Sequence, residues 1–305
     1  MKNTFKFIFS LSLSVATAAF LSSCGNSSEK KAETEHHEGD GHDHAKEGHD
    51  HAEGDEHEHH HGSDENYTTQ LKMSPENPQA GQAVLILLTP KLKKDIKADV
   101  PLDLNHEKKM HLIAVNEDLS TFQHLHPEYQ ASGSYDVKAT FPTGGNYLLF
   151  ADYKPSEGGE VADKLAIKVS GKASPSMNYS AEKLTWTSNS LSLTLKTKSR
   201  KFEAGKELHI NGILTQNGQS VNVETLENYL GAKAHVVMIE IADKDYIHAH
   251  PETANGNFHL HAEFEHEGMY RAWIQFMVNG KVQVADFVLN VIKGDGKAEA
   301  SEHKH

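Results

Sequence analysis

The sequence predicts an all-β protein with two tandem antiparallel β-sandwich domains that follow a disordered His-rich linker. Three observations carry this prediction. One histidine pattern occurs twice, apolar and polar residues alternate in short runs, and turn residues recur between those runs. Long amphipathic helical runs are scarce, and only residues 223–231 and their counterpart near 100–106 are candidates for a short helical turn.

Each copy of the histidine pattern has one His and then, thirteen positions later, the motif His-x-His-Pro. The two trios are His111, His124 and His126, and His235, His248 and His250. The similarity extends beyond the motif, since Ala80-Gly81 matches Ala204-Gly205 and Gly145-Asn146-Tyr147 matches Gly268-Met269-Tyr270. The two copies align over about a hundred residues with one single-residue gap, which indicates a duplicated domain.

Each copy reads as β-structure. Apolar residues at alternate positions, separated by polar ones, indicate half-buried strands in both copies: Tyr135, Val137, Ala139 and Phe141 in the first, and Phe258, Leu260, Ala262 and Phe264 in the second. Short strands without a helical layer favour a β-sandwich of immunoglobulin-like or cupredoxin-like type. We expect the first sandwich at residues 66–170, the second at 178–293, and a disordered tail at 294–305.

The N-terminal segment resembles a bacterial export signal. Lys2 and Lys6 precede an apolar run that is too short for a comfortable membrane span. The run ends in Leu21-Ser22-Ser23-Cys24, which resembles the lipobox of bacterial lipoproteins, and Cys24 is the only cysteine. The resemblance implies a signal peptide over residues 1–24, lipidation of Cys24 and attachment to the outer membrane of the bacterial envelope, on its periplasmic or surface face.

Residues 25–65 have almost no apolar content and therefore predict a disordered linker. The formal net charge of the chain is −13, and most of it lies in this segment. The linker also carries ten histidines among acidic residues: His36, His37, His42, His44, His49, His51, His57, His59, His60 and His61. Imidazole and carboxylate groups together suit copper, zinc and nickel, so we expect many weak metal sites here. The alternative is a solvated spacer.

The trios are the candidates for tighter metal sites. In a hairpin with an odd register, His111 shares a face with His124 and His126, and the same holds for His235, His248 and His250. Three imidazoles with an open fourth position suit zinc or copper, and Glu128, Glu252 or water is a candidate for that position. The apolar neighbours on this face predict that each trio lies at the rim of its sandwich. The alternative is that these histidines only bond loop carbonyls.

Three further histidines occur only in the second copy: His259, His261 and His266. They fall on the polar face of a predicted strand, which favours solvated side chains over an auxiliary metal site. His209 and His106 also lack a His counterpart in the other copy.

The stretch Met-His-Leu-Ile-Ala-Val-Asn at 110–116 and the His-Leu-His-Pro and His-Ala-His-Pro motifs resemble a set of bacterial secreted and lipid-anchored proteins. Those proteins have tandem immunoglobulin-like or cupredoxin-like domains and are linked to copper or other heavy-metal handling. The resemblance implies a metal-linked role in the envelope. A blue-copper site is disfavoured because the domains have no cysteine ligand.

The sequence thus predicts a non-enzymatic envelope lipoprotein that captures, buffers or transfers a divalent transition metal, with copper and zinc favoured over nickel. A metal efflux or uptake complex is its expected partner, and the absence of a basic stripe argues against nucleic acid. Two alternatives stay open. One is a metal-dependent redox or hydrolytic enzyme, and the other is a structural or adhesion module in which the histidines are incidental.

Overall fold

The structure, a computed structural model, describes residues 64–105, 107–249 and 251–294, all of which belong to one compact unit over residues 57–305. The predicted signal peptide with Cys24, the linker histidines, His106, His250 and the tail from residue 295 lie outside the described residues. Within the described part, no helix has the length and apolar character needed to span a membrane.

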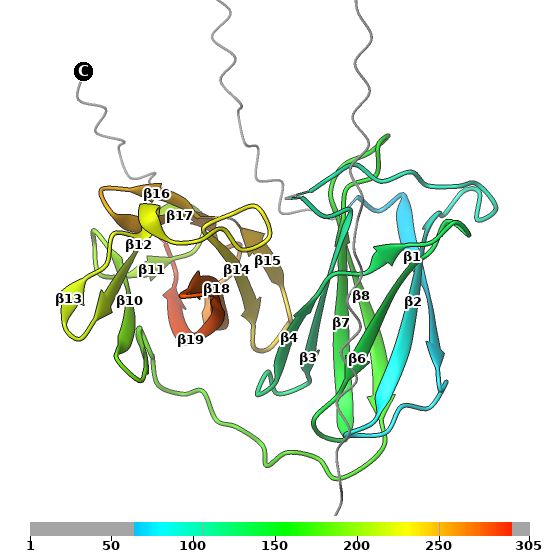
Figure 1. Cartoon of the computed structure of the whole chain (residues 1–305), viewed down its shortest axis with the longest axis horizontal. Helices are drawn as coiled ribbons and strands as arrows, with labels where there is room; N and C mark the ends of the chain where they lie inside the picture. The colour runs from blue at the N-terminus through cyan, green and yellow to red at the C-terminus, as the bar shows by residue number, and fades with distance from the viewer. Residues whose placement is uncertain (1–63, 106, 250, 295–305) are drawn as a thin grey trace, which may run out of the picture. The chain divides into compact units, whose positions relative to one another are not determined.

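The first domain is a sandwich of two four-stranded sheets. One sheet has the order β1-β2-β6-β5 and consists of β1 (Tyr67–Ser74), β2 (Ala83–Leu92), β6 (Tyr135–Thr140) and β5 (Glu128–Tyr129). The other has the order β4-β3-β7-β8 and consists of β4 (Phe122–Leu125), β3 (Met110–Asn116), β7 (Gly145–Tyr153) and β8 (Val161–Val169). These orders match an immunoglobulin-type sandwich, with β4 added beside its C strand (Figure 1).

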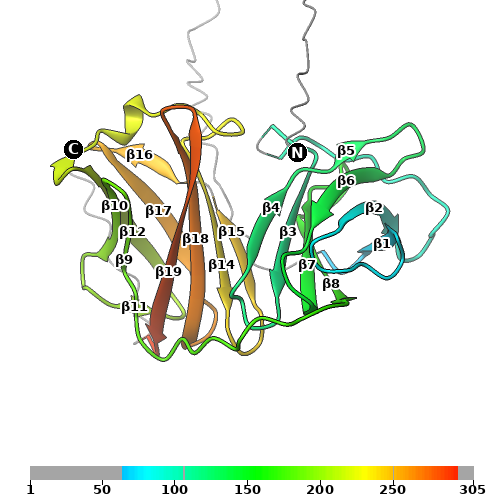
Figure 2. The same ribbon diagram turned by 60° about the horizontal axis from the view of Figure 1, so that its bottom comes forward.

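The second domain repeats this plan with a few additions (Figure 2). Its first sheet has the order β16-β17-β12-β10-β9 and consists of β16 (Glu252–Ala254), β17 (Asn257–Glu263), β12 (Glu207–Gln216), β10 (Leu191–Thr197) and β9 (Thr185–Ser188), with β13 (Gln219–Ser220) paired to β12. Its second sheet has the order β11-β19-β18-β14-β15 and consists of β11 (Phe202–Glu203), β19 (Lys281–Ile292), β18 (Gly268–Val278), β14 (Ala234–Glu240) and β15 (Tyr246–Ala249). The two-residue ladder between β11 and β19 is parallel, whereas the other strand pairs are antiparallel.

The expected helical turn exists in the second copy alone. Val223–Thr225 forms one turn of 3-10 helix, and the side chain of Asn222 caps it by accepting from the amide of Glu224. Residues 100–105 form no helix and instead make an isolated bridge between Leu102 and Pro155.

Backbone conformation supports the duplication. Gly81 and its counterpart Gly205 have φ angles of 77° and 75°, and Gly133 and Gly256 have 79° and 75°. Side chains other than Gly rarely adopt this left-handed region, so the same turns recur at the same positions of both copies.

Each sandwich has its own apolar core between its two sheets. In the first domain, Ile86 of β2 and Leu112 of β3 belong to one buried cluster, and in the second Ile210 of β12 and Val236 of β14 belong to another. The expected tandem β-sandwich fold is therefore confirmed.

The central strands β3 and β14 are buried along their whole length, which a sheet facing water on one side would not allow. Leu112 and Ala114 face the core of the first domain. Ile113 and Val115, which alternate with them, join a third buried cluster with Val237, Ile239 and Trp273 of the second domain. The outer faces of the two sheets thus pack against each other. The His-bearing face, predicted to lie at the rim of each sandwich, instead faces the neighbouring domain.

Two aromatic stacks cross this interface in a symmetric way. Phe122 of the first domain stacks on Trp273 of the second with 4.6 Å between ring centroids. Phe150 stacks on Tyr246 with 4.7 Å between centroids. Phe122 and Tyr246 occupy matching repeat positions, and so do Phe150 and Trp273. Each domain therefore offers the same surface to the other, as the subunits of a two-fold dimer do.

Candidate metal centre

The register of the two hairpins brings the histidines to the interface. Ile113 pairs with His124 in the first domain, and Val237 pairs with His248 in the second. The residue numbers in each pair sum to an odd number, so the expected odd register is confirmed. By period 2, His111 and His235 lie on the same faces as their partners. These are the faces that the two domains turn toward each other.

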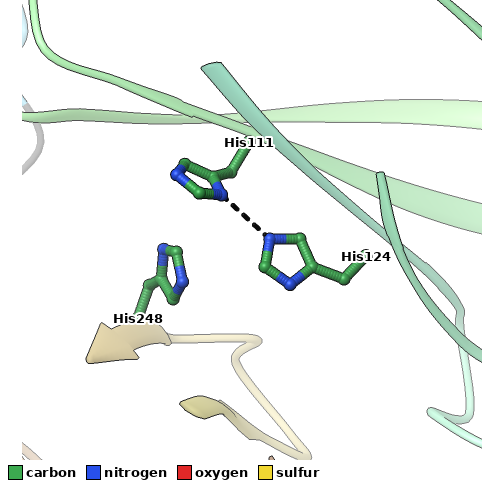
Figure 3. Close-up of side chains that lie close together, drawn as sticks. All are labelled: His111, His124 and His248. Atoms are coloured by element: carbon green, nitrogen blue, oxygen red, sulfur yellow. Dashed lines mark hydrogen bonds between the residues drawn. The ribbon is translucent and has the colours of Figure 1, made fainter. Parts of the chain in front are cut away.

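The described members of both trios gather in one place rather than in two. Ligand nitrogens of His111, His124 and His248 all lie within 4.8 Å of one another, although His248 comes from the other domain. Figure 3 shows the three rings turned toward one another. The ring centroid of His126 lies 5.0 Å from that of His111, and the ring centroid of His235 lies 6.1 Å from that of His111. We call this group of five rings the interdomain imidazole cluster.

Hydrogen bonds orient two of these rings through their outer nitrogens. The Nε2–H group of His111 donates to the carbonyl oxygen of Asn105 over 3.0 Å. His235, at the matching position, donates through Nε2–H to the carbonyl oxygen of Tyr229 over 2.9 Å. Because a neutral imidazole carries one proton, these bonds leave a lone pair on each Nδ1 atom.

The histidines that begin each His-x-His motif are oriented across the interface. His248 donates through Nδ1–H to the Oδ2 atom of Asp152 over 2.6 Å. His124 is 2.6 Å from Oε1 of Gln275 through its own Nδ1. Asp152 and Gln275 occupy matching repeat positions, directly opposite His111 and His235 in the strand ladders. Each domain therefore supplies a hydrogen-bond partner for the other domain's histidine.

The spacing of the inner nitrogens suits a bound cation. His111 Nδ1 and His124 Nε2 are hydrogen-bonded over 3.0 Å (Figure 3), and His124 is the donor because His111 already donates through Nε2–H to Asn105. Two lone pairs repel at this distance unless a proton or a metal ion lies between them. Two imidazole nitrogens on one tetrahedral zinc ion lie about 3.3 Å apart, given bonds of about 2.0–2.1 Å. The metal-free arrangement, in which His124 donates to His111, also requires the Gln275 amide to be reversed.

Burial keeps His111, His124 and His126 neutral. It lowers the pKa of His111 to about 4, and charge on His248 acts in the same direction. It lowers the pKa of His126 to about 3, with His111 as a further cause. The pKa of His124 is also well below its ordinary value, first because of burial and then because of the neighbouring imidazoles. Neutral imidazole is the form that ligates a metal, so these rings are ready to bind at pH 7.

Asp152 supplies the negative charge beside the cluster. Its burial acts to raise its pKa, but hydrogen bonds from His248 and Tyr246 and the charge of nearby imidazoles lower the pKa below its ordinary value. The hydroxyl group of Tyr246 donates to the same Oδ2 atom over 3.0 Å. A carboxylate that accepts from a ligand histidine fixes the ring and strengthens it as a donor.

The cluster contains a buried nitrogen that lacks a hydrogen-bond partner in the described part of the chain. The Nε2 atom of His126 is buried and makes no hydrogen bond there. A buried polar atom in this state costs free energy unless a water molecule or an ion satisfies it.

The glutamates considered as further ligands or as a general base do not join the cluster. Glu128 pairs with Lys108 over 3.0 Å, and its side chain is 69% exposed. Glu252 is exposed on β16. Asp152 and Gln275 were not predicted from the sequence. These two residues occupy matching positions in the repeats, opposite the first His of each trio. This signal becomes visible only once the strand pairing is known.

The family model described as "Domain of unknown function (DUF8832)" matches residues 52–171, which include the first sandwich, and residues 187–293, which include the second sandwich except the start of β9. No curated protein matches the chain significantly. Among solved structures, the chain is similar to the Escherichia coli adhesin FdeC, with 14% identity and a TM-score of 0.27 over 77% of this chain and 66% of that one. It is also similar to trypsin-activated alpha-2-macroglobulin from Escherichia coli, with 9% identity and a TM-score of 0.24 over 75% of this chain and 16% of that one.

A third solved structure, the ectodomain of mouse nectin-like molecule 4, gives 11% identity and a TM-score of 0.19 over 78% of this chain and 67% of that one. The chain spans less than two thirds of the first two of these structures, and similarity at this level does not extend to function. The family match covers both repeats. The chain therefore belongs to the family defined by the DUF8832 domain.

Proposed function

We propose that this protein binds a divalent transition metal ion, copper or zinc, at the interdomain imidazole cluster, and that it captures, buffers or transfers the ion in the bacterial envelope. The observation that carries the proposal is the convergence of ligand nitrogens from His111, His124 and His248 within 4.8 Å. Outward hydrogen bonds on the same rings support it, because they direct the lone pairs inward.

In this proposal the metal is shared by the two domains. Three to five neutral imidazoles offer a closed set of nitrogen ligands, which suits tight binding more than catalysis with an open position. Asp152 and Gln275 hold the rings in place. The ion would then also act as a clamp, because ligands from both domains must come together around it.

The remaining parts of the proposal come from the sequence. Export and lipid attachment through Cys24 would place the protein at an envelope membrane, where its partner would be a metal efflux or uptake complex. The linker histidines would collect ions weakly and pass them to the cluster. Nickel is the third candidate ion, because imidazole serves all three.

The test uses the full chain loaded with zinc or copper and dialysed against a mild chelator that empties weak sites. We expect about one ion to remain per chain and the Tm to be higher than without metal. The double variant His124→Gln/His248→Gln should lose both the ion and the rise in Tm. His266→Gln is the matched control, since this side chain is 62% exposed and lies outside the cluster. Equal metal retention in the double variant and the control would overturn the proposal.

A further inference from the structure

A second group of histidines lies on the opposite sheet of the second domain, outside the interdomain imidazole cluster. His209 on β12 pairs directly with His261 on β17, and Asn211 pairs with His259. The residues that alternate with them, such as Ile210 and Leu260, are in the core of the domain. The three histidines therefore project from the outer face of the sheet.

The three rings lie close together on this face. Ring centroids are 4.5 Å apart for His209 and His261, 5.0 Å for His259 and His261, and 5.5 Å for His209 and His259. The Nδ1 atom of His209 lies 3.4 Å from the Nε2 atom of His259. One ligand nitrogen from each ring falls within 4.8 Å of the others. Strand pairing thus creates a trio that residue spacing alone does not indicate.

Neighbouring side chains orient two of the rings. His261 donates through Nδ1–H to Oε1 of Glu207 over 2.9 Å, and His259 donates through Nδ1–H to Oδ1 of Asn211 over 3.1 Å. Both bonds leave a lone pair on Nε2. A metal-ligating histidine commonly has such a carboxylate or amide partner on its other nitrogen.

We propose that His209, His259 and His261 form a second site for a divalent transition metal ion, separate from the interdomain cluster. Its ligand is an ion that prefers imidazole, namely zinc, copper(II) or nickel. All three side chains are partly exposed, so the remaining coordination positions are open to water or to a ligand from another molecule. The site therefore exchanges its ion faster than the buried cluster does.

The first domain lacks this trio. Its matching positions hold Leu85, Asp136 and Lys138, of which Leu85 and Lys138 form the matching cross-strand pair. The lysine places a positive charge where the second domain has an imidazole. The two repeats thus share the interdomain cluster, but only the second repeat carries the outer trio.

The experiment titrates the full chain with zinc and follows each histidine by long-range 1H–15N spectra of the imidazole rings. Signals of His209, His259 and His261 are assigned from their single Gln variants. We expect the 15N signals of the metal-facing nitrogens of these three rings to shift together to the values of metal-bound imidazole. In equilibrium dialysis, the double variant His259→Gln/His261→Gln should bind one equivalent of zinc less than the unmodified chain. His266 is exposed in the same domain but is not part of the trio, so it serves as the control. The His266→Gln variant should bind as much zinc as the unmodified chain.

The two sites are read independently, because the cluster histidines have their own signals. The proposal fails if the three outer signals stay unchanged after the other histidines are saturated, or if the double variant binds as much zinc as the control. Because these side chains project from a sheet surface, the double variant should keep the Tm of the metal-free protein. If the Tm of the double variant is lower, the spectra of the single variants still show whether each of the three rings binds zinc.

Discussion

The packing of the two domains on each other predicts a large cost for Phe150→Ala. Phe150 projects from the outer face of the first domain's sheet, yet it is 1% exposed because it stacks on Tyr246 of the second domain. Replacing a buried Phe by Ala costs about 3–5 kcal/mol, and loss of the aromatic pair is included in this range at about 1 kcal/mol. If the domains did not pack, the same side chain would face water and its loss would cost less than about 0.5 kcal/mol.

Urea unfolding of the metal-free chain, followed by tryptophan fluorescence, measures this cost. Both tryptophans, Trp186 and Trp273, belong to the second domain, whereas the substitution is in the first. A loss of about 3 kcal/mol in the free energy of unfolding reported by these tryptophans would show coupling across the interface. Leu149→Ala is the control, since Leu149 lies beside Phe150 but faces the core of its own domain. Negligible effects of both Leu149→Ala and Phe150→Ala on the unfolding reported by these tryptophans would refute the packing of the two domains.

Three further predictions concern the cluster. The metal-free protein should lose stability as the pH falls from about 6.5 to about 4, because in this range the histidines bind protons in the unfolded state but not in the folded state. For His111 alone, whose pKa in the folded state is about 4, the loss in the free energy of unfolding is on the order of 3 kcal/mol. Urea unfolding at each pH measures it. Above pH 6.5 this contribution should be constant. Asp152→Asn should weaken metal binding about 10–100-fold in competition with a chelator, whereas Asp99→Asn on the exposed surface should leave it unchanged. Bound zinc should move the acid unfolding transition of the chain to lower pH, and removal of zinc with a strong chelator should restore the transition of the metal-free protein.

Much of the fold follows from local sequence patterns. Alternation at Phe258, Leu260 and Ala262 predicts a strand, and β17 contains these residues facing the core. The offset between the two copies predicts that their elements match, and the paired glycine turns agree with it. An odd register places the imidazoles of each copy on one face, and the pairs Ile113–His124 and Val237–His248 have it. These features depend on neighbours along the chain, and the sequence displays them directly.

The assembly of the cluster depends on contacts that no single repeat contains. Ile113 and Val115 look like core residues of their own domain, because burial against a second domain selects the same residue types as an interior. The partners of His124 and His248 lie 151 and 96 residues away. Likewise, His209 meets His261 only through the pairing of β12 with β17, so counting residues between histidines does not reveal the outer trio.

The duplication offers a reason why the two trios meet. Two equal surfaces that pack face to face bring each residue close to the counterpart of its own neighbour, as in a two-fold dimer. Asp152 and Gln275 break this symmetry, since one matching position carries a charge and the other an amide. A single carboxylate beside several neutral imidazoles would offset part of the charge of the proposed divalent ion without adding a second buried charge, whose desolvation would be costly.

The most direct test of a shared metal centre is anomalous diffraction from crystals of the protein grown with one equivalent of zinc or copper. The proposal predicts one strong anomalous peak between the domains, within about 2.0–2.2 Å of nitrogens from His111, His124 and His248. Separate peaks, each bound by the histidines of a single domain, would contradict a shared centre. An absence of any peak at the cluster with both metals would contradict metal binding there.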